Sequence, residues 1–422
     1  MFNLKSQKIS PFIEISAGLT TFFSMVYVLA ANPHILSQAG MDRDALFTAT
    51  ALGTIVATLI MAFVANLPFA VAPGMGLNAF FVVIATQMGY SWPQALTAVL
   101  ISGSIFVLLS ISPLRQIILR EVPETLQLGV CAGIGLMIAY IGLLNSGVIL
   151  PGPALGDIAQ GKPLLFVFGL LATGILMALK FRFAILFGII ITTIIGIPLG
   201  ITNTAGLSEG FVSLPPSFSQ IAFKFDFSAI TSFDFIGVII ALLFMEVVDG
   251  LAGFLGLFSV MGADAERYKP RIGRAFIADS MGVVVGSCLG LSPNTTYAES
   301  GAGVAAGGRT GLTALVVAIC FFIALFVSPL FLMIPFSAVA PALVVVGLLM
   351  VQSVAKLNFK DITESFPAFA TLILIALSWR ISDSLAIGWQ LYIIMKVISG
   401  NYRKITVTVW VVGIIFALKT FL

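Results

Sequence analysis

The chain has 422 residues, of which 59% are hydrophobic and only 9% are charged, and its mean hydropathy is +1.12. These values exclude an ordinary soluble protein and leave no hydrophilic block long enough for a separate soluble domain. The net charge of +3 gives no indication of a nucleic-acid partner. The three cysteines lie in apolar runs without metal-site spacing, so no metal or other cofactor is expected. No Walker A loop, zinc motif or nucleophile elbow is present, so an enzyme is not expected.

Apolar runs of about 17–25 residues, the length that crosses ~30 Å of hydrocarbon, recur along the whole chain. They predict an all-α polytopic membrane protein surrounded by membrane lipid. The predicted segments are 13–32, 45–66, 71–87, 94–112, 124–146, 163–180, 183–200, 233–254, 272–290, 293–307, 310–333, 337–355, 364–379, 382–399 and 404–421. The third and tenth segments are short and rich in glycine and proline, which predicts broken or half-crossing helices. The first run is too long for a signal peptide and is expected to stay as a helix.

The lysine and arginine residues predict the orientation, because cytoplasmic loops carry an excess of both. With the N-terminus inside and one crossing per segment, 16 of the 21 basic residues fall on the inside. The five outside are Arg43, Lys162, Lys224, Arg380 and Lys419. The sequence therefore predicts a multi-pass protein of the plasma membrane, the inner membrane in a bacterium, with a cytoplasmic N-terminus. Of these assignments, only the side of Lys419 depends on whether the segment 404–421 crosses the membrane.

Three sets of residues recur in the same order at nearly the same offset. They are Pro73 and Pro293 (220 residues apart), the Ser-Pro-Leu triplets at 112–114 and 328–330 (216 apart), and Pro123 with Gly129 against Pro341 with Gly347 (218 apart). The offsets predict a duplicated unit of seven segments. Because seven is odd, the second copy enters the membrane from the opposite face. Such an inverted repeat is widespread in secondary transporters, which bind their substrates near the midplane.

The two interrupted segments carry polar residues close to their prolines. They read Ala-Pro-Gly-Met-Gly-Leu-Asn-Ala-Phe-Phe at 72–81 and Leu-Ser-Pro-Asn-Thr-Thr-Tyr-Ala-Glu-Ser-Gly at 291–301. Each would place the unpaired N–H groups of a half-helix N-terminus near the centre of the protein. Asn78 and Glu299 follow their prolines by five and six residues, so each is predicted to face that centre. The glycines of both stretches are instead expected to allow close helix packing.

Acidic residues within apolar segments are functional candidates, because each costs about 2.5–3.5 kcal/mol on insertion scales. Glu246 and Asp249 are three residues apart and therefore neighbours on one helical face. Two close carboxylates in a low dielectric resist ionising together, so this pair is predicted to carry a proton. No basic residue lies in the middle of a predicted segment to neutralise the pair. Asp279 begins another apolar run and fits a structural role as well as a functional one.

The acids also limit the class of substrate. Half-helix N-termini alone would suit an anion, but the added carboxylates would repel one, which favours a cation or a neutral solute with several N–H donors. Asn78 offers a donor and an acceptor, and Phe80, Phe81 and Tyr297 are candidates for stacking on a flat ring, although such residues more often face lipid or the core. Together with the neighbouring Thr296, these residues predict a site for a planar heterocycle.

Three stretches of the chain resemble a known family. Phe-Ala-Val-Ala-Pro-Gly-Met-Gly-Leu-Asn-Ala-Phe-Phe at 69–81 looks like the signature of the AzgA-like purine permeases, which belong to the nucleobase–cation symporter superfamily. Ala-Gly-Leu-Thr-Thr-Phe-Phe at 17–23, continuing to Asn32-Pro33, is similar to their first helix. Tyr-Ala-Glu-Ser at 297–300 and the glycine-rich run to Gly311 resemble their tenth and eleventh helices. The resemblance runs almost from end to end.

The resemblance implies a UraA-like fold with a core domain and a gate domain. About fourteen transmembrane segments would form two inverted repeats of seven, with the third and tenth helices broken. The core would comprise residues 1–115 (segments 1–4) and 203–333 (segments 8–11). The gate would comprise residues 116–202 (segments 5–7) and 334–422 (segments 12–14 and the C-terminal segment). A homodimer is also an expectation of this resemblance.

The same resemblance implies proton-coupled symport of adenine, guanine or hypoxanthine, driven by the proton gradient. It assigns substrate binding to Glu246 and Glu299, with Asn78 supporting the site, and proton coupling to Asp249 together with Glu246. The chain departs from the family, which usually has Asp for Glu246, Asp-Thr for Asp249-Gly250, and Gly-Thr-Ser where residues 290–292 read Gly-Leu-Ser. Because the acid at 246 is longer and the hydroxyl at 250 is missing, the identity of the transported base stays open. The alternative is a transporter or channel of the same fold for xanthine, uracil or an anion such as sulfate or bicarbonate.

Overall fold

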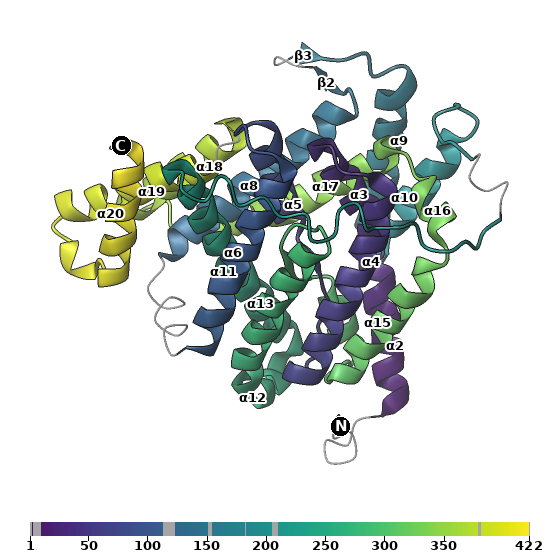
Figure 1. The fold of residues 1–422 in the computed structure, drawn as a ribbon, viewed down its shortest axis with the longest axis horizontal. Helices are drawn as coiled ribbons and strands as arrows, with labels where there is room; N and C mark the ends of the chain where they lie inside the picture. Colours follow the sequence, from purple (N-terminus) through teal and green to yellow (C-terminus); the bar gives the residue numbers. More distant parts are fainter. Residues whose placement is uncertain are drawn as a thin grey trace.

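Helices make up most of the described chain (Figure 1). This computed structural model describes residues 2, 10–112, 123–150, 154–181, 183–204, 210–378 and 381–421. Some residues of the sequence analysis lie outside this set: Pro113 and Leu114 of the first Ser-Pro-Leu triplet, and six basic residues of the orientation count, namely Lys5, Lys8, Arg115, Arg120, Arg182 and Arg380.

The first half of the chain contains three short strands and a series of helices. Its elements are α2 (Pro11–Met25), α3 (Val28–Leu36), η1 (Ser37–Ala39), α4 (Arg43–Ile60), η2 (Met61–Ala65, a π-helix), β1 (Val71–Pro73), α5 (Met75–Thr86), α6 (Trp92–Ile111), α8 (Glu124–Asn145), β2 (Ile149–Leu150), β3 (Ala154–Leu155), α9 (Gly161–Ala178) and α10 (Ala184–Gly196). Strands β2 and β3 pair with each other in a small hairpin after α8.

The second half repeats the alternation of long helices with one short strand. Its elements are α11 (Phe233–Met261), η4 (Gly262–Asp264), α12 (Ala265–Tyr268), η5 (Lys269–Arg271), α13 (Ile272–Cys288), β4 (Asn294–Thr296), α14 (Ser300–Ala305), α15 (Gly311–Leu325), α16 (Ser328–Leu332), α17 (Phe336–Val351), η6 (Gln352–Lys356), α18 (Ile362–Ser378), α19 (Ile381–Ile398), η7 (Tyr402–Lys404) and α20 (Val407–Phe421). Every predicted segment therefore contains a helix.

Seven helical stretches among the described residues are long and apolar enough to cross a bilayer. They are Pro11–Ala39, Arg43–Ala65, Trp92–Ile111, Glu124–Asn145, Gly161–Ala178, Phe233–Phe258 and Phe336–Lys356. Shorter apolar helices include α5, α10, α15 and α18. The prediction of an all-α polytopic membrane protein is confirmed, whereas the count of fourteen segments stays a prediction.

Two boundaries differ from the sequence prediction for clear physical reasons. Helix α11 continues past residue 254 because the apolar sequence continues, and it ends before Gly262, whose φ of 60° breaks the helix. The predicted segment 310–333 is divided into α15 and α16. Pro329 cannot donate a hydrogen bond to the carbonyl of Leu325, so α15 ends there and Pro329 lies in the first turn of α16.

The helices pack mainly within two groups. Helices α2–α6 contact α11–α15, while α8–α10 contact α17–α19. In Figure 1, α2, α4, α13 and α15 lie side by side in the lower half, and α8, α9, α17 and α18 lie in the upper half. Contacts of α5 with α8 and of α11 with α19 join the two groups.

Helices α8 and α17 approach each other through facing glycines. A Cβ atom built on Gly347 would lie 2.5 Å from the carbonyl oxygen of Gly135, and one on Gly135 would lie 2.8 Å from that of Gly347. The two backbones can meet this closely only without side chains. In the repeated set of Pro123 with Gly129 and Pro341 with Gly347, only the glycines have matching roles. Gly129, like Gly347, faces the backbone of another helix, with its Cβ position 2.4 Å from Ala368 O. Pro341 lies inside α17 and does not begin it.

The substitution Gly347→Ala is expected to destabilise the protein by about 1–3 kcal/mol, because the new methyl group must push the two helices apart. The control is Gly174→Ala in α9, where no atom lies within 4 Å of the Cβ position. That change should be neutral or stabilising by up to ~1 kcal/mol, since alanine favours the helix. Thermal unfolding of both purified variants in detergent measures the difference, and equal melting temperatures would contradict the close contact.

Candidate functional site

Two short strands pair with each other in the buried interior of the protein and hold the interrupted segments together. Strand β1 pairs antiparallel with β4, with Val71 opposite Thr296 and Pro73 opposite Asn294. The pairing is extended at both ends, where Gly74 N donates to Pro293 O at 3.0 Å and Tyr297 N donates to Ala70 O at 2.9 Å. Backbone polar groups at membrane depth need such internal partners. Each strand then leads into a half-helix, α5 or α14, which confirms the predicted breaks in the third and tenth helices.

Side chains from each interrupted segment bind the other segment. The hydroxyl of Tyr297 donates to Pro73 O at 2.6 Å, and Ala70 N donates to Ser300 Oγ at 2.9 Å. Ser292 Oγ donates to Asn78 Oδ1, and Asn78 is fully buried. Asn78 therefore faces the centre, as the sequence predicts, where it joins the two repeats.

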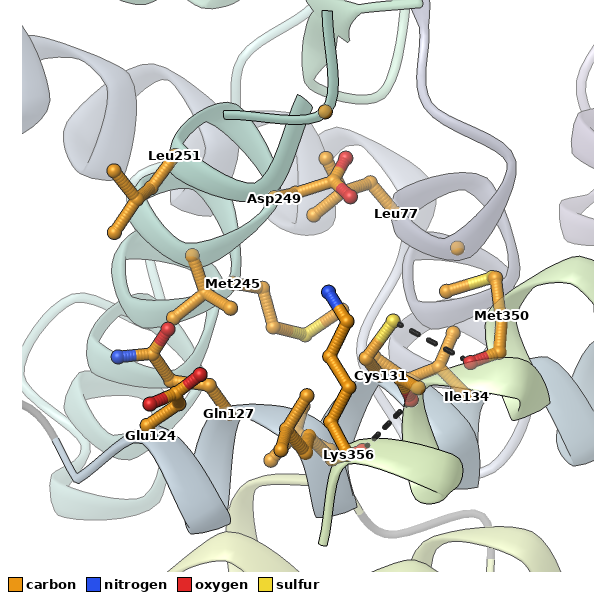
Figure 2. Close-up of a pocket in the computed structure, with 16 residues that line it drawn as sticks. Leu77, Glu124, Gln127, Cys131, Ile134, Met245, Asp249, Leu251, Met350 and Lys356 are labelled. Carbon is orange, nitrogen blue, oxygen red and sulfur yellow. Dashed lines mark hydrogen bonds between the residues drawn. The ribbon is translucent and has the colours of Figure 1, made fainter. Parts of the chain in front are cut away.

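A cavity of about 400 Å³ lies beside this pair of strands (Figure 2). One wall comes from α5 and α11, including Leu77, Met245 and Asp249, and the opposite wall comes from α8, α17 and η6. Figure 2 shows the Asp249 carboxylate pointing into the cavity from α11. The volume lies within the range of ~300–1,000 Å³ that is usual for small-molecule sites.

Two further carboxylates lie behind Asp249 and are almost completely buried. Glu246 accepts a hydrogen bond from Ser102 Oγ at 2.7 Å, and Asp279 accepts one from Thr296 Oγ1 at 2.7 Å. In each acid the second carboxylate oxygen has no hydrogen-bond partner. A buried charge without compensation is costly, so these sites favour carboxyl groups that can hold a proton.

Glu299 occupies the position just before α14 and opens to a second cavity of about 350 Å³. The hydroxyl of Tyr27, which lies between α2 and α3, donates to Glu299 Oε1 at 2.7 Å. Val345 and Leu349 of α17 line this second cavity, while Met350 of the same helix lines the first. Helix α17 thus contributes to the walls of both cavities.

The four acids are close enough to influence one another electrostatically. Glu246 interacts with Asp279, Asp279 with Asp249, and Asp249 with Glu299. Within the described residues none of the four forms a salt bridge with lysine or arginine, and no group of three metal-ligating side chains is found. The arrangement can accept N–H donors from a ligand, and a change of charge on one acid alters the electrostatic potential at the next.

The structure brings the predicted site residues together but exposes only two of them to the cavities. Asp249 and Glu299 line cavity walls, whereas Glu246, Asn78 and Thr296 lie buried behind them. Phe80 of α5 is likewise fully buried and is not among the residues that line either cavity. Helix periodicity placed Glu246 and Asp249 on one face, but it could not show which of them reaches the ligand space.

The small residue after Asp249 has a local explanation. A Cβ atom at Gly250 would lie 2.8 Å from Asp279 Oδ2, which is too close without movement. The glycine therefore lets the Asp279 carboxylate lie directly against α11. A threonine at this position, as in the family pattern, would require a different placement of Asp279.

Sequence reasoning missed Glu14, which is fully buried near the start of α2. Its carboxylate accepts hydrogen bonds from the backbone N–H groups of Arg309, Thr310 and Thr313 and from both threonine hydroxyls, at 2.6–3.2 Å. Glu14 thereby satisfies the first turn of α15. The Arg-Thr-Gly sequence at 309–311 indicates the start of α15, where unpaired N–H groups need an acceptor such as Glu14.

A buried lysine was also missed. Lys396 of α19 is only 2% exposed, and its amine pairs with Glu364 of α18, which also accepts from Thr125 of α8 at 2.8 Å. The sequence placed this lysine near the end of a segment. The pair lies among α8, α18 and α19 and does not neutralise Glu246 or Asp249.

Comparison with known proteins identifies relatives along the entire chain. The guanine/hypoxanthine permease PbuO of Bacillus subtilis is 39% identical over 434 residues, covering 100% of both chains. The adenine permease AdeP of Escherichia coli is 37% identical and covers 99% of this chain and 95% of its own. The guanine/hypoxanthine permease PbuG of Bacillus subtilis is 38% identical, with 96% and 95% covered. These relatives are transporters and not enzymes, and they confirm the resemblance to the purine permeases.

Solved structures share the fold at low sequence identity. The transmembrane domain of a cyanobacterium bicarbonate transporter BicA has a TM-score of 0.61 at 17% identity and covers 87% of this chain and 96% of its own. Murine Solute Carrier 26 family member A9, an anion transporter in the inward-facing state, has a TM-score of 0.65 at 14% identity, with 92% and 68% covered. The sequence profile of the Permease family matches residues 12–387. With this match and its full-length relatives, the chain belongs to the Permease family.

Proposed function

We propose that this permease is a secondary transporter that takes up a nucleobase of the purine class in symport with protons. The observation that carries the proposal is the acidic cavity. Asp249 presents a carboxylate without a basic partner to a cavity of about 400 Å³ beside a half-helix. Purines offer ring and amino N–H donors that such a carboxylate can accept. The purine permeases to which the chain is similar support the same substrate class.

In this proposal the base meets Asp249 in the first cavity and Glu299 in the second, because each acid lines one of the two cavities. Glu246, one helical turn from Asp249, is proposed to contribute to substrate binding and to hold the coupled proton. Asn78, Thr296 and Phe80 are proposed to shape the site from behind. The electrostatic series from Glu246 to Glu299 supports coupling, since a proton added to one acid changes the charge felt by the next.

The two helix groups are proposed to act as the core and the gate. The cavity walls come from both groups, so a relative movement of the groups would open and close the space beside Asp249. The cytoplasmic N-terminus and a homodimer formed through the gate remain part of the proposal. The bias of basic residues supports the orientation.

The likeness to anion transporters concerns the fold alone, because the identities are only 14–17%. The acids argue against an anion as the substrate here. An anion in either cavity would be repelled by the carboxylate that lines it, Asp249 in the first or Glu299 in the second, unless that carboxylate were protonated. A neutral base carrying N–H donors fits the same groups in either cavity.

The test is uptake by the purified protein in proteoliposomes. Radiolabelled adenine, guanine, hypoxanthine, xanthine and uracil are offered separately, with and without an inward proton gradient. The proposal expects accumulation of at least one purine that collapses when a protonophore is added. Uptake that is unaffected by the gradient would refute symport, and uptake of none of the five bases by folded protein would refute nucleobase transport.

A further inference from the structure

A single lysine points into the acidic cavity from the wall opposite Asp249. Lys356 is the last residue of η6, and Figure 2 shows its amine directed into the cavity toward the Asp249 carboxylate. The side chain is exposed, and no hydrogen bond or salt bridge to another described residue holds its amine. Among the described residues that line this cavity, Lys356 is the only lysine or arginine.

The uncompensated charge of Lys356 distinguishes it from the buried Lys396. The amine of Lys396 is fixed by Glu364 and Thr363, so its charge is already neutralised within the protein. Lys356 shares its cavity with Glu124, but the two form no ion pair in this structure. Its three N–H donors are therefore available to a ligand bound against Asp249.

The cavity thus has an acceptor-only group on one wall and a donor-only group on the other. An ionised aspartate accepts hydrogen bonds and a lysine ammonium donates them. A ligand that bridges the walls must offer N–H groups on one side and an acceptor oxygen or nitrogen on the other. This pattern is more selective than the acids alone.

The 6-oxopurines and the 6-aminopurines differ in whether position 6 accepts or donates hydrogen bonds. A 6-oxopurine such as hypoxanthine or guanine carries a carbonyl oxygen and the ring nitrogen N7, both acceptors, next to an N1–H donor. A 6-aminopurine such as adenine replaces the oxygen by an amino group, whose N–H bonds would point at the ammonium of Lys356. With position 6 facing Lys356, the first class offers an acceptor oxygen to the ammonium, whereas the second places an amino donor against it and leaves only ring nitrogens as acceptors.

We infer that Lys356 is a specificity-determining residue that donates to the 6-oxygen of the base and so selects 6-oxopurines over 6-aminopurines. This inference rests on the proposed nucleobase transport. Hydrogen bonds to a charged group give a preference of about 10- to 100-fold, the range expected for a lysine partly accessible to water. The residue belongs to the gate group of helices, so it adds recognition from the side opposite the acids.

The experiment measures binding of radiolabelled hypoxanthine to the purified protein and its competition by adenine. Wild type should bind hypoxanthine about 10- to 100-fold more tightly than adenine. Lys356→Met should lose most of this preference through weaker hypoxanthine binding, with adenine binding unchanged or improved. Lys356→Arg, which keeps the charge and the donors, should retain it. Lys360→Met is the matched control, since Lys360 is exposed in the loop after η6 and lines neither cavity.

A second measurement on wild type avoids any effect of substitution on folding. Unsubstituted purine, which lacks the 6-oxygen, should bind about 10-fold or more weakly than hypoxanthine. An unchanged preference in Lys356→Met, a wild-type preference for adenine, or equal binding of purine and hypoxanthine would overturn the inference. If wild type binds no purine at all, the proposed function itself fails, and the two failures are thereby distinguished.

Discussion

The substitution Glu299→Gln is expected to reduce proton-driven purine uptake by 100-fold or more while the protein still folds and reaches the membrane. Glutamine keeps the shape of the side chain, and its amide oxygen can still accept from Tyr27, which lies 2.7 Å from Glu299 Oε1. It cannot carry the negative charge or exchange a proton. Loss of a hydrogen bond to a charged group costs about 1.5–3 kcal/mol, and loss of the proton site removes coupling in addition. The measurement is the initial uptake rate at matched amounts of membrane protein.

Two further variants separate the role of Glu299 from that of its surroundings. Tyr27→Phe removes one hydrogen bond but keeps the acid, so uptake should fall only about 5- to 20-fold. Glu246→Gln should lose uptake as fully as Glu299→Gln, although its own partner is Ser102. Normal accumulation by Glu299→Gln at any external pH would remove this residue from the site.

Replacement of Glu14 by alanine is expected to prevent the protein from folding into a stable form. The carboxylate accepts from three backbone N–H groups and two hydroxyls at the start of α15, and the donors on Thr310 and Thr313 are buried with it. Alanine would leave them without partners in an apolar environment. Breaking a buried charged network of this kind costs about 3–5 kcal/mol, a large part of the stability of a typical domain. Yield and thermal unfolding in detergent give the readout.

The control for Glu14 uses a neighbouring ion pair on the surface. Arg309 Nε donates to Asp264 at 2.9 Å, and Asp264 is well exposed, so Asp264→Asn should cost less than about 1 kcal/mol. Glu14→Gln keeps the size of the side chain but has only one acceptor oxygen, so its melting temperature should lie between those of Glu14→Ala and Asp264→Asn. A melting temperature for Glu14→Ala within a degree of wild type would show that water replaces the carboxylate and that the network adds no stability.

Much of the fold could be predicted because membrane segments follow simple physical rules. Long apolar runs marked every helix-containing segment, and glycine with proline marked the two breaks. The recurrence of Pro73 at Pro293 marked the two segments that hold β1 and β4, whose pairing places Pro73 opposite Asn294. Acidic residues in apolar runs marked Glu246, Asp249 and Glu299, because such residues are too costly to keep without a role.

The remaining features depend on how helices rotate and meet, which no single segment encodes. Helical spacing put Glu246 and Asp249 on one face, but the rotation of α11 against α6 decides that, of these two acids, only Asp249 reaches the cavity. Glu14 lies at the start of the first predicted segment, and its burial arises from α15, whose Thr313 lies 299 residues away in the sequence. Lys356 appeared as a cytoplasmic charge after α17, and only the packing of α17 against α8 turns it toward Asp249.

The pairing of β1 with β4 also limits how such a protein can have arisen. A polypeptide with one repeat alone would leave the N–H and C=O groups of its strand without partners inside the bilayer, at a cost of several kcal/mol per group. A second copy inserted in the opposite direction supplies the missing strand, as the two halves of this chain do for each other. A half-length protein with this site would therefore need two subunits of opposite topology, which the two halves of one chain supply together.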